Sequence, residues 1–418
     1  MMDTVIYKSP SPKDIFCYTP SIAVTSTGKL ICTIDLGGDG VSKLPGNNIY
    51  PKDRNEKHFG LGCIIESVNN GRTWEKVGEF NFFHARVFTV KNDIYIIGHH
   101  GDICIIASKD DGKTWSNTVE LTKNQKWHGS ATNVLISKDS ICLAMEQRLL
   151  IDEIKGWNVA GLSPQVLKAN INADLLIPDS WSISKPITFR QVYDYNSNSQ
   201  FGVPFYPCSK NGPKELSNSL HNAPIGWLEA NIVRFSDPSH LWYHEDLKTF
   251  HLFLRSHTGS TNFACLLKVE DDGNNRLVPK LEKAPSGEEK LYVQLPGGHL
   301  KFFLFFDKGT NLFWLISNQS TDSMRKIETL EEVSRYELPN NERHRLQLHY
   351  SKNCVDWCFA KMVVSSSNEF LSRNYPSAII KGEDLHIVCR STDINAKNAQ
   401  YSNIITHHQI ENFRSLVY

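Results

Sequence analysis

The sequence has no excess of charge of either sign. It contains 45 Lys and Arg residues against 45 Asp and Glu residues, so its formal net charge is zero. A protein that binds nucleic acid or an anionic membrane over a broad surface usually carries a clear positive excess. We therefore expect neither nucleic acid nor a membrane as a partner, although a local basic pocket stays open.

Long apolar stretches and paired cysteines are also missing. The sequence has no apolar run of about 18 residues, and its N-terminal segment lacks the basic and apolar regions of a signal peptide. The ten cysteines form no CxxC pair, and Cys354 and Cys358 have no histidine at zinc-site spacing. These features predict buried free thiols in a reducing compartment, and hence a cytoplasmic protein.

Nucleotide and nucleophile-elbow signatures are absent as well. The sequence contains no Walker loop, no Rossmann glycine fingerprint and no GxSxG motif. Helical periodicity is nearly absent, and the best helix candidate covers 323–338. Most of the secondary structure is therefore expected to be β.

What the sequence does contain is a series of short apolar runs in pairs. Each pair flanks a polar turn, which is typical of β-hairpins. The pairs occupy residues 21–35, 85–98, 101–115, 130–146, 240–256, 299–317 and 376–391.

One polar turn occurs twice in nearly the same form. SKDDGKTW at 108–115 matches SVNNGRTW at 67–74, and weaker copies lie at 269–274 and 351–357. In such a turn the Asp or Asn side chain accepts hydrogen bonds from turn amides, Gly takes a positive φ, and Trp packs between neighbouring strands. Repeated units of roughly 40–60 residues with four strands each indicate a β-propeller.

The repeated units predict one all-β propeller domain of four-stranded blades that spans 1–418. We count six units, which begin near residues 18, 81, 128, 224, 296 and 372. The last unit has three strands, and DTVIYKS at 3–9 is predicted to supply the fourth strand and close the ring. Seven blades stay open as an alternative, because 186–223 is long and irregular. We interpret 186–223 as a loop insertion over one face.

Two acidic residues lie within apolar strand-like runs. GWLEANIV at 226–233 puts Glu229 and Asn231 on one face by the period of two, and AMEQR at 144–148 does the same for Glu146 and Arg148. Two carboxyl groups on inner strands are what glycoside cleavage requires, one as proton donor and one as base or nucleophile. Alternatively, each glutamate pairs with an arginine and only holds blades together.

Several cationic side chains occupy similar positions. PGGHLKF at 296–302 places His299 and Lys301 on one strand face, and its glycine pair permits close backbone approach. The other candidates, at strand ends, are His128, Arg255 and Arg390. Arginine in such a place binds a carboxylate bidentately, so the set suits an acidic sugar. A satisfied structural hydrogen bond is the alternative for each residue taken singly.

Metal-binding patterns are weak. DLGGDG at 35–40 offers Asp35 and Asp39 without the spacing of an EF-hand, and GHHGD at 98–102 offers only His99 and His100. We predict no cofactor and no metal ligands, with a structural divalent cation as an open alternative.

The repeated turns make the chain resemble the Asp-box propellers described as sialidase-like. Sialidases carry an early Arg-Ile-Pro segment and three arginines for the sugar carboxylate, and Arg-Ile-Pro is absent here. The chain resembles more closely the family that removes terminal L-rhamnose from glucuronic acid, whose members are hydrolases or lyases. This resemblance spans nearly the whole chain and includes YTPSIAV (18–24), GDICIIASKDDGKTW (101–115), GWLEANIV (226–233), LPGGHLKF (295–302) and THHQIENFR (406–414).

The chain departs from that family at one position. A Ser-His-Asp segment with a catalytic histidine in the family matches TID at 33–35, so Ile34 stands where the histidine would be. His84 and Arg86, in FFHAR at 82–86, have no counterpart in the family pattern. We expect them to rebuild the site for a different linkage, unless the protein binds a sugar without cleaving it.

These features predict a glycoside hydrolase that cleaves a terminal sugar from an acidic oligosaccharide of the rhamnosyl-glucuronate type. The predicted catalytic residues are Glu146, Glu229, His128 and His299. The predicted substrate-binding residues are His84, Arg86, Arg148, Asn231, Arg255, Lys301, Arg390 and Tyr401. In a lyase acting on the same uronate, a histidine would take the C5 proton and Tyr401 would be a proton donor. An exo-sialidase and a non-catalytic glycan-binding propeller are the remaining alternatives.

Overall fold

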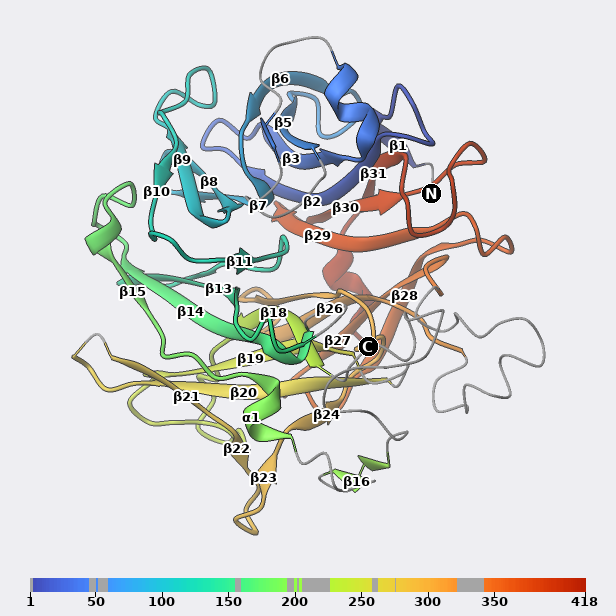
Figure 1. Cartoon of the computed structure of the whole chain (residues 1–418). Helices are drawn as coiled ribbons and strands as arrows, with labels where there is room; N and C mark the ends of the chain where they lie inside the picture. Colours follow the sequence, from blue (N-terminus) through green and yellow to red (C-terminus); the bar gives the residue numbers. More distant parts are fainter. Residues whose placement is uncertain are drawn as a thin grey trace.

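Six antiparallel sheets surround one axis in the computed structural model of the chain (Figure 1). The structure describes residues 3–44, 50–51, 59–154, 159–193, 199–200, 203–204, 226–257, 262–274, 276–321 and 342–418. The sheets follow one another along the chain, so each sheet is one blade of a β-propeller. The prediction of an all-β propeller is confirmed, and the described residues form six blades.

Blades 1 to 3 run from the innermost to the outermost strand in chain order. Blade 1 contains β2 (Phe16–Val24), β3 (Leu30–Gly37), β5 (Phe59–Ser67) and β6 (Glu75–Phe80), with β4 (Tyr50–Pro51) also paired to β5. Blade 2 contains β7 (Phe83–Val90), β8 (Asp93–His100), β9 (Asp102–Ser108) and β10 (Val119–Glu120). Blade 3 contains β11 (Trp127–His128) and β12 (Leu135–Ile136), which both pair with β13 (Ser140–Arg148), and then β14 (Leu162–Asn170) and β15 (Trp181–Ile183).

Blades 4 to 6 follow the same order. Blade 4 contains β18 (Gly226–Val233), β19 (Thr249–His257) and β20 (Phe263–Asp271), and both β21 (Leu277–Lys280) and β24 (Tyr292–Gln294) pair with β20. Blade 5 contains β25 (Phe303–Asp307), β26 (Leu312–Asn318), β27 (Arg345–Ser351) and β28 (Cys358–Ser365). Blade 6 contains β29 (Arg373–Lys381), β30 (Asp384–Ser391), β31 (Ile404–Ile410) and β1 (Thr4–Lys8).

The remaining described elements are short. Strand β16 (Ser199–Gln200) pairs with β17 (Val203–Pro204), and β22 (Glu282–Lys283) pairs with β23 (Glu289–Lys290). The helices are α1 (Phe189–Val192) and the 3-10 turns Asp39–Lys43, Val159–Gly161, Pro178–Ser180 and Phe413–Leu416. No helix in the described ranges is long and apolar enough to span a membrane. Of the insertion predicted at 186–223, the structure describes residues 186–193, which include α1, and the strands β16 and β17. The rest of the insertion, like the helix predicted at 323–338, lies outside the described residues.

The N-terminal strand closes the ring, as predicted. Strand β1 pairs antiparallel with β31, so the first described segment completes the last blade. Just before β1, Asp3 accepts hydrogen bonds from Arg373 Nε at 2.8 Å and Nη2 at 2.5 Å. His408 Nδ1 lies 3.1 Å from the other oxygen of the Asp3 carboxylate. Side-chain contacts therefore reinforce the backbone pairing at the closure.

The hydrophobic core lies between neighbouring blades. Because each sheet is covered on both faces, strands such as β3 are buried along their whole length and consist of apolar residues in near succession. One cluster joins Ile34 and Cys63 of blade 1 to Val388 and Ile405 of blade 6. The nine cysteines of the described residues are free, and eight of them are buried. These buried cysteines act as small apolar core residues.

The two repeated turns join the third and fourth strands of blades 1 and 2. In each turn, the serine hydroxyl accepts the glycine N–H and the Asn or Asp oxygen accepts the threonine N–H, all at 2.9 Å. The pairs are Ser67 with Gly71, Asn69 with Thr73, Ser108 with Gly112, and Asp110 with Thr114. Trp74 then packs edge-on against His407 of blade 6. The turns thus connect strands within a blade and help to pack neighbouring blades.

A buried lysine bridges the axis of the ring. Lys301 precedes β25 of blade 5 and is 1% exposed. Its ammonium donates to the carbonyl of Ala131 in blade 3 at 2.8 Å and to the carbonyl of Pro376 in blade 6. On one side of this bridge the inner strands enclose an apolar cavity of about 350 Å³, lined in part by Val87, Val233 and Ile379. A polar cavity lies on the other side.

Candidate functional site

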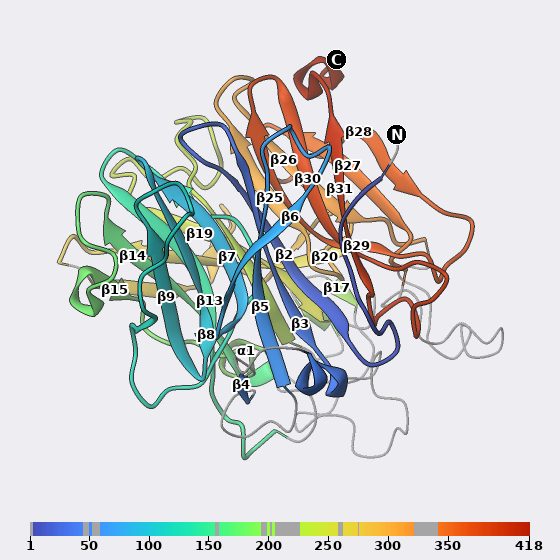
Figure 2. The same ribbon diagram turned by 90° about the horizontal axis from the view of Figure 1, so that it is seen from above.

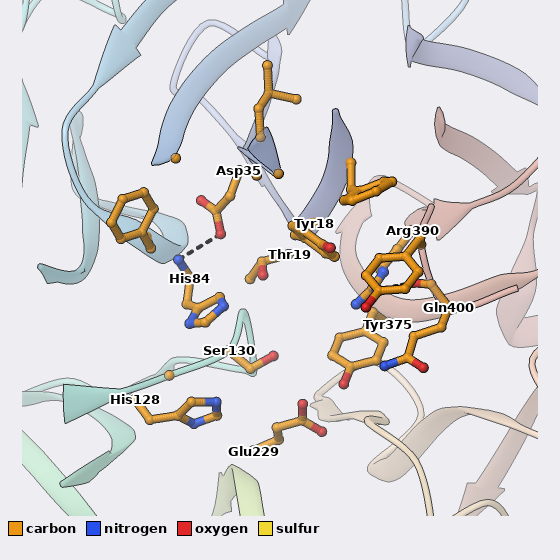
Figure 3. Close-up of a pocket in the computed structure, with 18 of the residues that line it drawn as sticks. Tyr18, Thr19, Asp35, His84, His128, Ser130, Glu229, Tyr375, Arg390 and Gln400 are labelled. Atoms are coloured by element: carbon orange, nitrogen blue, oxygen red, sulfur yellow. Dashed lines mark hydrogen bonds between the residues drawn. The ribbon is translucent and has the colours of Figure 1, made fainter. Parts of the chain in front are cut away.

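The innermost strands of four blades share one backbone feature. Thr19 on β2, His84 on β7, Glu229 on β18 and Tyr375 on β29 have φ between 45° and 61°. The strand pairing shifts register at each of these residues, so each is a β-bulge. For a residue other than glycine the left-handed conformation costs about 1–2 kcal/mol, and such strain gathers at functional sites. All four side chains project into one cavity (Figure 3).

The cavity has a volume of about 540 Å³, a size typical of small-molecule sites. It lies at the end of the ring marked by the 3-10 turn Asp39–Lys43, opposite the end that carries the C-terminus (Figure 2). Its other polar lining residues are Tyr18, Asp35, Asp39, His128, Ser130, Arg390, Lys397, Gln400 and Tyr401. Polar groups therefore converge here from blades 1, 2, 3, 4 and 6.

An arginine links Glu229 to Tyr375 at one side of the cavity. Arg255, on β19, donates from Nη1 to Glu229 Oε2 at 3.5 Å and to the Tyr375 hydroxyl at 3.0 Å. Its Nε donates to the His299 carbonyl at 2.9 Å, which fixes the guanidinium plane. Burial alone would lower the pKa of Arg255, but Tyr375 and Glu229 outweigh burial and raise that pKa. The cation therefore stays charged beside a carboxylate and a phenol oxygen.

A second carboxylate faces Glu229 across the cavity. Asp35, on β3, is 3% exposed, and its Oδ2 accepts the backbone N–H of His84 at 2.7 Å. Figure 3 shows Asp35 and Glu229 on opposite sides of the cavity. Two carboxyl groups on either side of a bound sugar can act as general acid and as nucleophile or base in glycoside cleavage.

Glu146 lies behind the cavity wall. It belongs to β13, the second strand of blade 3, and not to an innermost strand as predicted. Its Oε1 accepts the Ala230 N–H at 2.9 Å, and its Oε2 lies 3.2 Å from His128 Nδ1. Glu146 thus supports the Glu229 bulge in the way that Asp35 supports the His84 bulge. It reaches the cavity through His128, which lines it.

Three histidines gather where blades 2 and 3 meet. His84 Nδ1 lies 3.0 Å from His99 Nε2, and the ring centroids of His84 and His128 are 5.4 Å apart. His84 and His128 line the cavity on the side that runs from Asp35 to Glu229 (Figure 3). Because a neutral imidazole offers one donor and one acceptor, this wall suits a ligand rich in hydroxyl groups.

Positive charge surrounds Tyr375. The Arg390 guanidinium lies 5.0 Å from the Tyr375 ring centroid and 4.4 Å from that of Tyr18, and Arg343 lies 5.8 Å from the Tyr375 centroid. Burial, with the nearby charges of Arg390 and Arg255, lowers the pKa of Arg343 to about 9. This crowding of cations favours an anionic group on this side of the cavity.

Three predicted substrate ligands instead join blades. The Arg86 guanidinium donates to the Ala144 carbonyl at 2.6 Å, which ties blade 2 to blade 3. Asn231 Oδ1 accepts the Leu304 N–H at 3.0 Å and ties blade 4 to blade 5. Lys301 bridges the axis. These groups underlie the cavity and do not line it.

His299 and Arg148 also lie outside the cavity lining. His299 is fully buried, and burial together with the charge of Arg255 lowers its pKa to about 3, so its ring is neutral. Arg148 is half-buried at the end of β13. The predicted residues that do line the cavity are His84, His128, Glu229, Arg390 and Tyr401.

Two predicted strand faces are replaced by irregular backbone. The bulge at Glu229 breaks the period of two, so Glu229 enters the cavity while Asn231 turns toward blade 5. His299 and Lys301 lie before the start of β25 and not within a strand. The predicted close approach at the preceding glycines does occur, since a β-carbon on Gly298 would lie 2.5 Å from the Phe263 carbonyl oxygen.

The sequence does not single out Tyr18, Arg343 or Tyr375, and it offers Asp35 only as a metal ligand. A signal for the bulges is nevertheless present. Five innermost segments contain a residue followed by Pro or Ala and then a polar residue, namely TPS (19–21), HAR (84–86), SAT (130–132), EAN (229–231) and YPS (375–377). The first residue of every triplet lines the cavity. Aligning the blades on this triplet locates the site.

Comparison with known proteins finds solved structures that share the fold of this chain. No protein-family model and no curated protein sequence matches the chain. An α-L-arabinanase from Penicillium chrysogenum, solved with arabinobiose, matches with a TM-score of 0.52 and 10% identity over 99% of this chain and 98% of that chain. An α-L-arabinofuranosidase from Fusarium graminearum, solved with an iminosugar inhibitor, matches with a TM-score of 0.51 and 10% identity over 98% of each chain.

A sialidase from Trypanosoma rangeli, solved with sialic acid, also matches. Its TM-score is 0.51 and its identity 10%, over 98% of this chain and 58% of that chain. At such identities the likeness establishes a shared fold. The resemblance to sialidase-like propellers is therefore confirmed as a resemblance of fold.

Proposed function

We propose that this protein is a glycoside hydrolase that removes a terminal sugar from an acidic oligosaccharide. The observation that carries the proposal is the placement of Asp35 and Glu229 on opposite sides of one polar cavity (Figure 3). Propellers of the same fold include proteins named as arabinanase, arabinofuranosidase and sialidase, each solved with a sugar or a sugar mimic.

In this proposal Asp35 donates a proton to the leaving oxygen. Glu229, paired with Arg255, faces the positive charge that develops at the anomeric carbon. The Tyr375 hydroxyl accepts from the same guanidinium and can assist Glu229 on that side. His84 and His128 bind sugar hydroxyl groups, and Glu146 orients His128.

The proposed substrate carries a uronic acid next to the terminal sugar, as in a rhamnosyl-glucuronate. Arg390 and Lys397 line the cavity, and Arg255 and Arg343 lie behind Tyr375. A sugar carboxylate bound on this side offsets like charges that burial leaves poorly solvated.

An exo-sialidase is the second candidate. Sialidases use a tyrosine nucleophile, and here Tyr375 shares a guanidinium with Glu229. A lyase draws support from a different pair, since Glu146 holds His128 at the cavity wall where it can act as a base.

The test is incubation of the full chain with sialyl, rhamnosyl-glucuronate and unsaturated-uronyl oligosaccharides, followed by mass analysis of the products. Cleavage with gain of one water supports hydrolysis, and cleavage without it means elimination. Asp35→Asn and Glu229→Gln are each expected to lower kcat by about 10²–10⁴-fold. Glu383→Gln, at a carboxylate whose side chain is 70% exposed, is the matched control. Saturable sugar binding without any product would contradict the hydrolase proposal and indicate a non-catalytic glycan-binding propeller.

A further inference from the structure

Two histidines and a glutamate come together in blade 4, outside the lining of the polar cavity. Within the described ranges, His244, His251 and Glu282 form the group of His, Cys, Asp and Glu whose ligand atoms all lie within 4.8 Å of one another. His244 lies in the turn before β19, His251 on β19 and Glu282 on β22. Three separate segments therefore contribute one metal-binding atom each. The pairs Asp35 with Asp39 and His99 with His100, considered from the sequence, do not form such a group.

His251 is held rigidly at the centre of this group. It is fully buried, and its ring packs against Phe235 and Trp242 at centroid distances of 5.0 and 5.8 Å. Its Nε2 lies 2.7 Å from Glu282 Oε2. A neutral imidazole is the form that binds a metal.

Glu282 presents one oxygen to the histidines. Its Oε1 accepts the Lys283 N–H at 2.8 Å and lies 3.3 Å from Lys268 Nζ. These two donors hold the Oε1 side of the carboxylate in place. The other oxygen, Oε2, is directed toward His244 and His251.

His244 leaves the group open to solvent. Its side chain is 34% exposed, and its Nε2 lies 3.9 Å from Glu282 Oε2. Two imidazole nitrogens and one carboxylate oxygen, with a fourth position open to water, match the ligand set of four-coordinate zinc. Calcium and magnesium require more oxygen ligands than these residues offer.

We propose that His244, His251 and Glu282 bind one Zn²⁺ ion that fastens the β22–β23 hairpin to β19 at the outer part of blade 4 (Figure 1). Zinc replaces the proton between His251 Nε2 and Glu282 Oε2, and the neutral ring then carries its proton on Nδ1. Lys268 stays on Oε1 and keeps the carboxylate oriented. None of the three ligand residues lines the polar cavity, so this proposal does not depend on the glycosidase proposal.

Metal binding is tested on the full chain after chelator treatment and desalting. Titration with ZnCl₂ is expected to show one tightly bound equivalent, and CoCl₂ is expected to give the visible bands of four-coordinate Co²⁺. His244→Gln and Glu282→Gln should weaken zinc binding by more than the roughly 10–100-fold that loss of an outer-shell partner costs. His100→Gln removes a histidine outside the group and should leave the affinity unchanged.

Hydrogen exchange separates this site from adventitious binding at other histidines. Zinc should slow exchange of backbone amides at 282–290 in the wild type and not in His244→Gln. Circular dichroism melting without zinc checks that each variant folds, and His244→Gln is the safer variant because its side chain is partly exposed. Failure of the wild type to bind zinc, or equal binding by wild type, His244→Gln and Glu282→Gln, would overturn the proposal.

Discussion

Tyr375 illustrates how single residues build the site. Its φ of 51° places it in a conformation that a tyrosine rarely adopts, and its hydroxyl then lies 3.0 Å from Arg255 Nη1. The Pro376 carbonyl is held at the same bulge by Lys301. The strain is therefore balanced by two cations that bind the residue and its neighbour, and the phenol is fixed in the cavity before any ligand arrives.

Tyr375→Phe tests this residue directly. The ring stays in place for Arg390 and Arg343, while the oxygen that accepts from Arg255 is lost. We expect kcat on the cleaved substrate to fall by at least about tenfold, with a melting temperature close to that of the wild type. Steady-state kinetics and calorimetry measure the two effects. An unchanged kcat would show that the hydroxyl takes no part in the reaction.

The blades are the elements that the sequence predicts best. Their strands are covered on both faces, so apolar runs such as LICTID and DICIIAS mark β3 and β9 plainly. The sequence pattern does not predict the bulges. Regular alternation assigns each strand residue to one face of the sheet, and the extra residue at a bulge breaks that alternation. For this reason Glu229 is found at the site while Asn231 is not, although the two stand two positions apart.

The joints between blades follow from the same irregularity. Asn133 uses its whole side-chain amide on one residue of the next blade, accepting the Ile232 N–H at 2.8 Å and donating to the Ile232 carbonyl at 2.6 Å. Such a joint depends on which strands become neighbours in space. The sequence alone therefore does not distinguish Asn133 from a surface asparagine.

Asn133→Ala should therefore destabilise the fold. The substitution leaves the buried N–H and carbonyl of Ile232 without partners, which costs about 1–3 kcal/mol for each unsatisfied group. Urea unfolding is expected to show a lower midpoint at unchanged slope. Asn172→Ala, at an exposed residue whose side chain accepts a hydrogen bond from Lys91, is the matched control and should shift the midpoint little. Equal urea midpoints for the two variants would contradict the proposed contribution of the Asn133–Ile232 hydrogen bonds to stability.

At the scale of the whole molecule, the closure of the ring depends on Asp3. Burial opposes ionisation of Asp3, but the hydrogen bonds and charges of His408 and Arg373 lower its pKa from 3.8 to about 2. Ionised Asp3 therefore contributes stability that is fully present above pH 3.8 and is lost as the pH falls through about 2. Asp3→Asn should lower the unfolding free energy at neutral pH, and the difference from wild type should vanish in acid. If the difference in unfolding free energy between wild type and Asp3→Asn did not change with pH across this range, the stabilising role of ionised Asp3 would be refuted.

The axis of the molecule responds to pH in the same sense, but in a higher pH range. Burial lowers the pKa of Lys301 from 10.5 to about 7, although Glu229 opposes the shift. Between these two values the unfolded chain binds more protons than the folded chain, so the folded state gains stability as the pH rises, by up to about 1.4 kcal/mol per pH unit. Relative to Lys301→Met, the wild type should gain stability between about pH 7 and pH 9. Parallel curves for the two proteins in urea titrations would exclude a shifted lysine.

The Lys301 bridge also has a consequence for traffic through the ring. Because its ammonium, from blade 5, donates to carbonyls of blades 3 and 6, the side chain crosses the axis and a sugar chain cannot pass through the ring at this point. A sugar chain that enters the polar cavity by its terminal sugar must therefore leave from the side by which it entered. After cleavage, the released terminal sugar would lie deeper in the cavity than the remaining oligosaccharide. The oligosaccharide would then have to dissociate first.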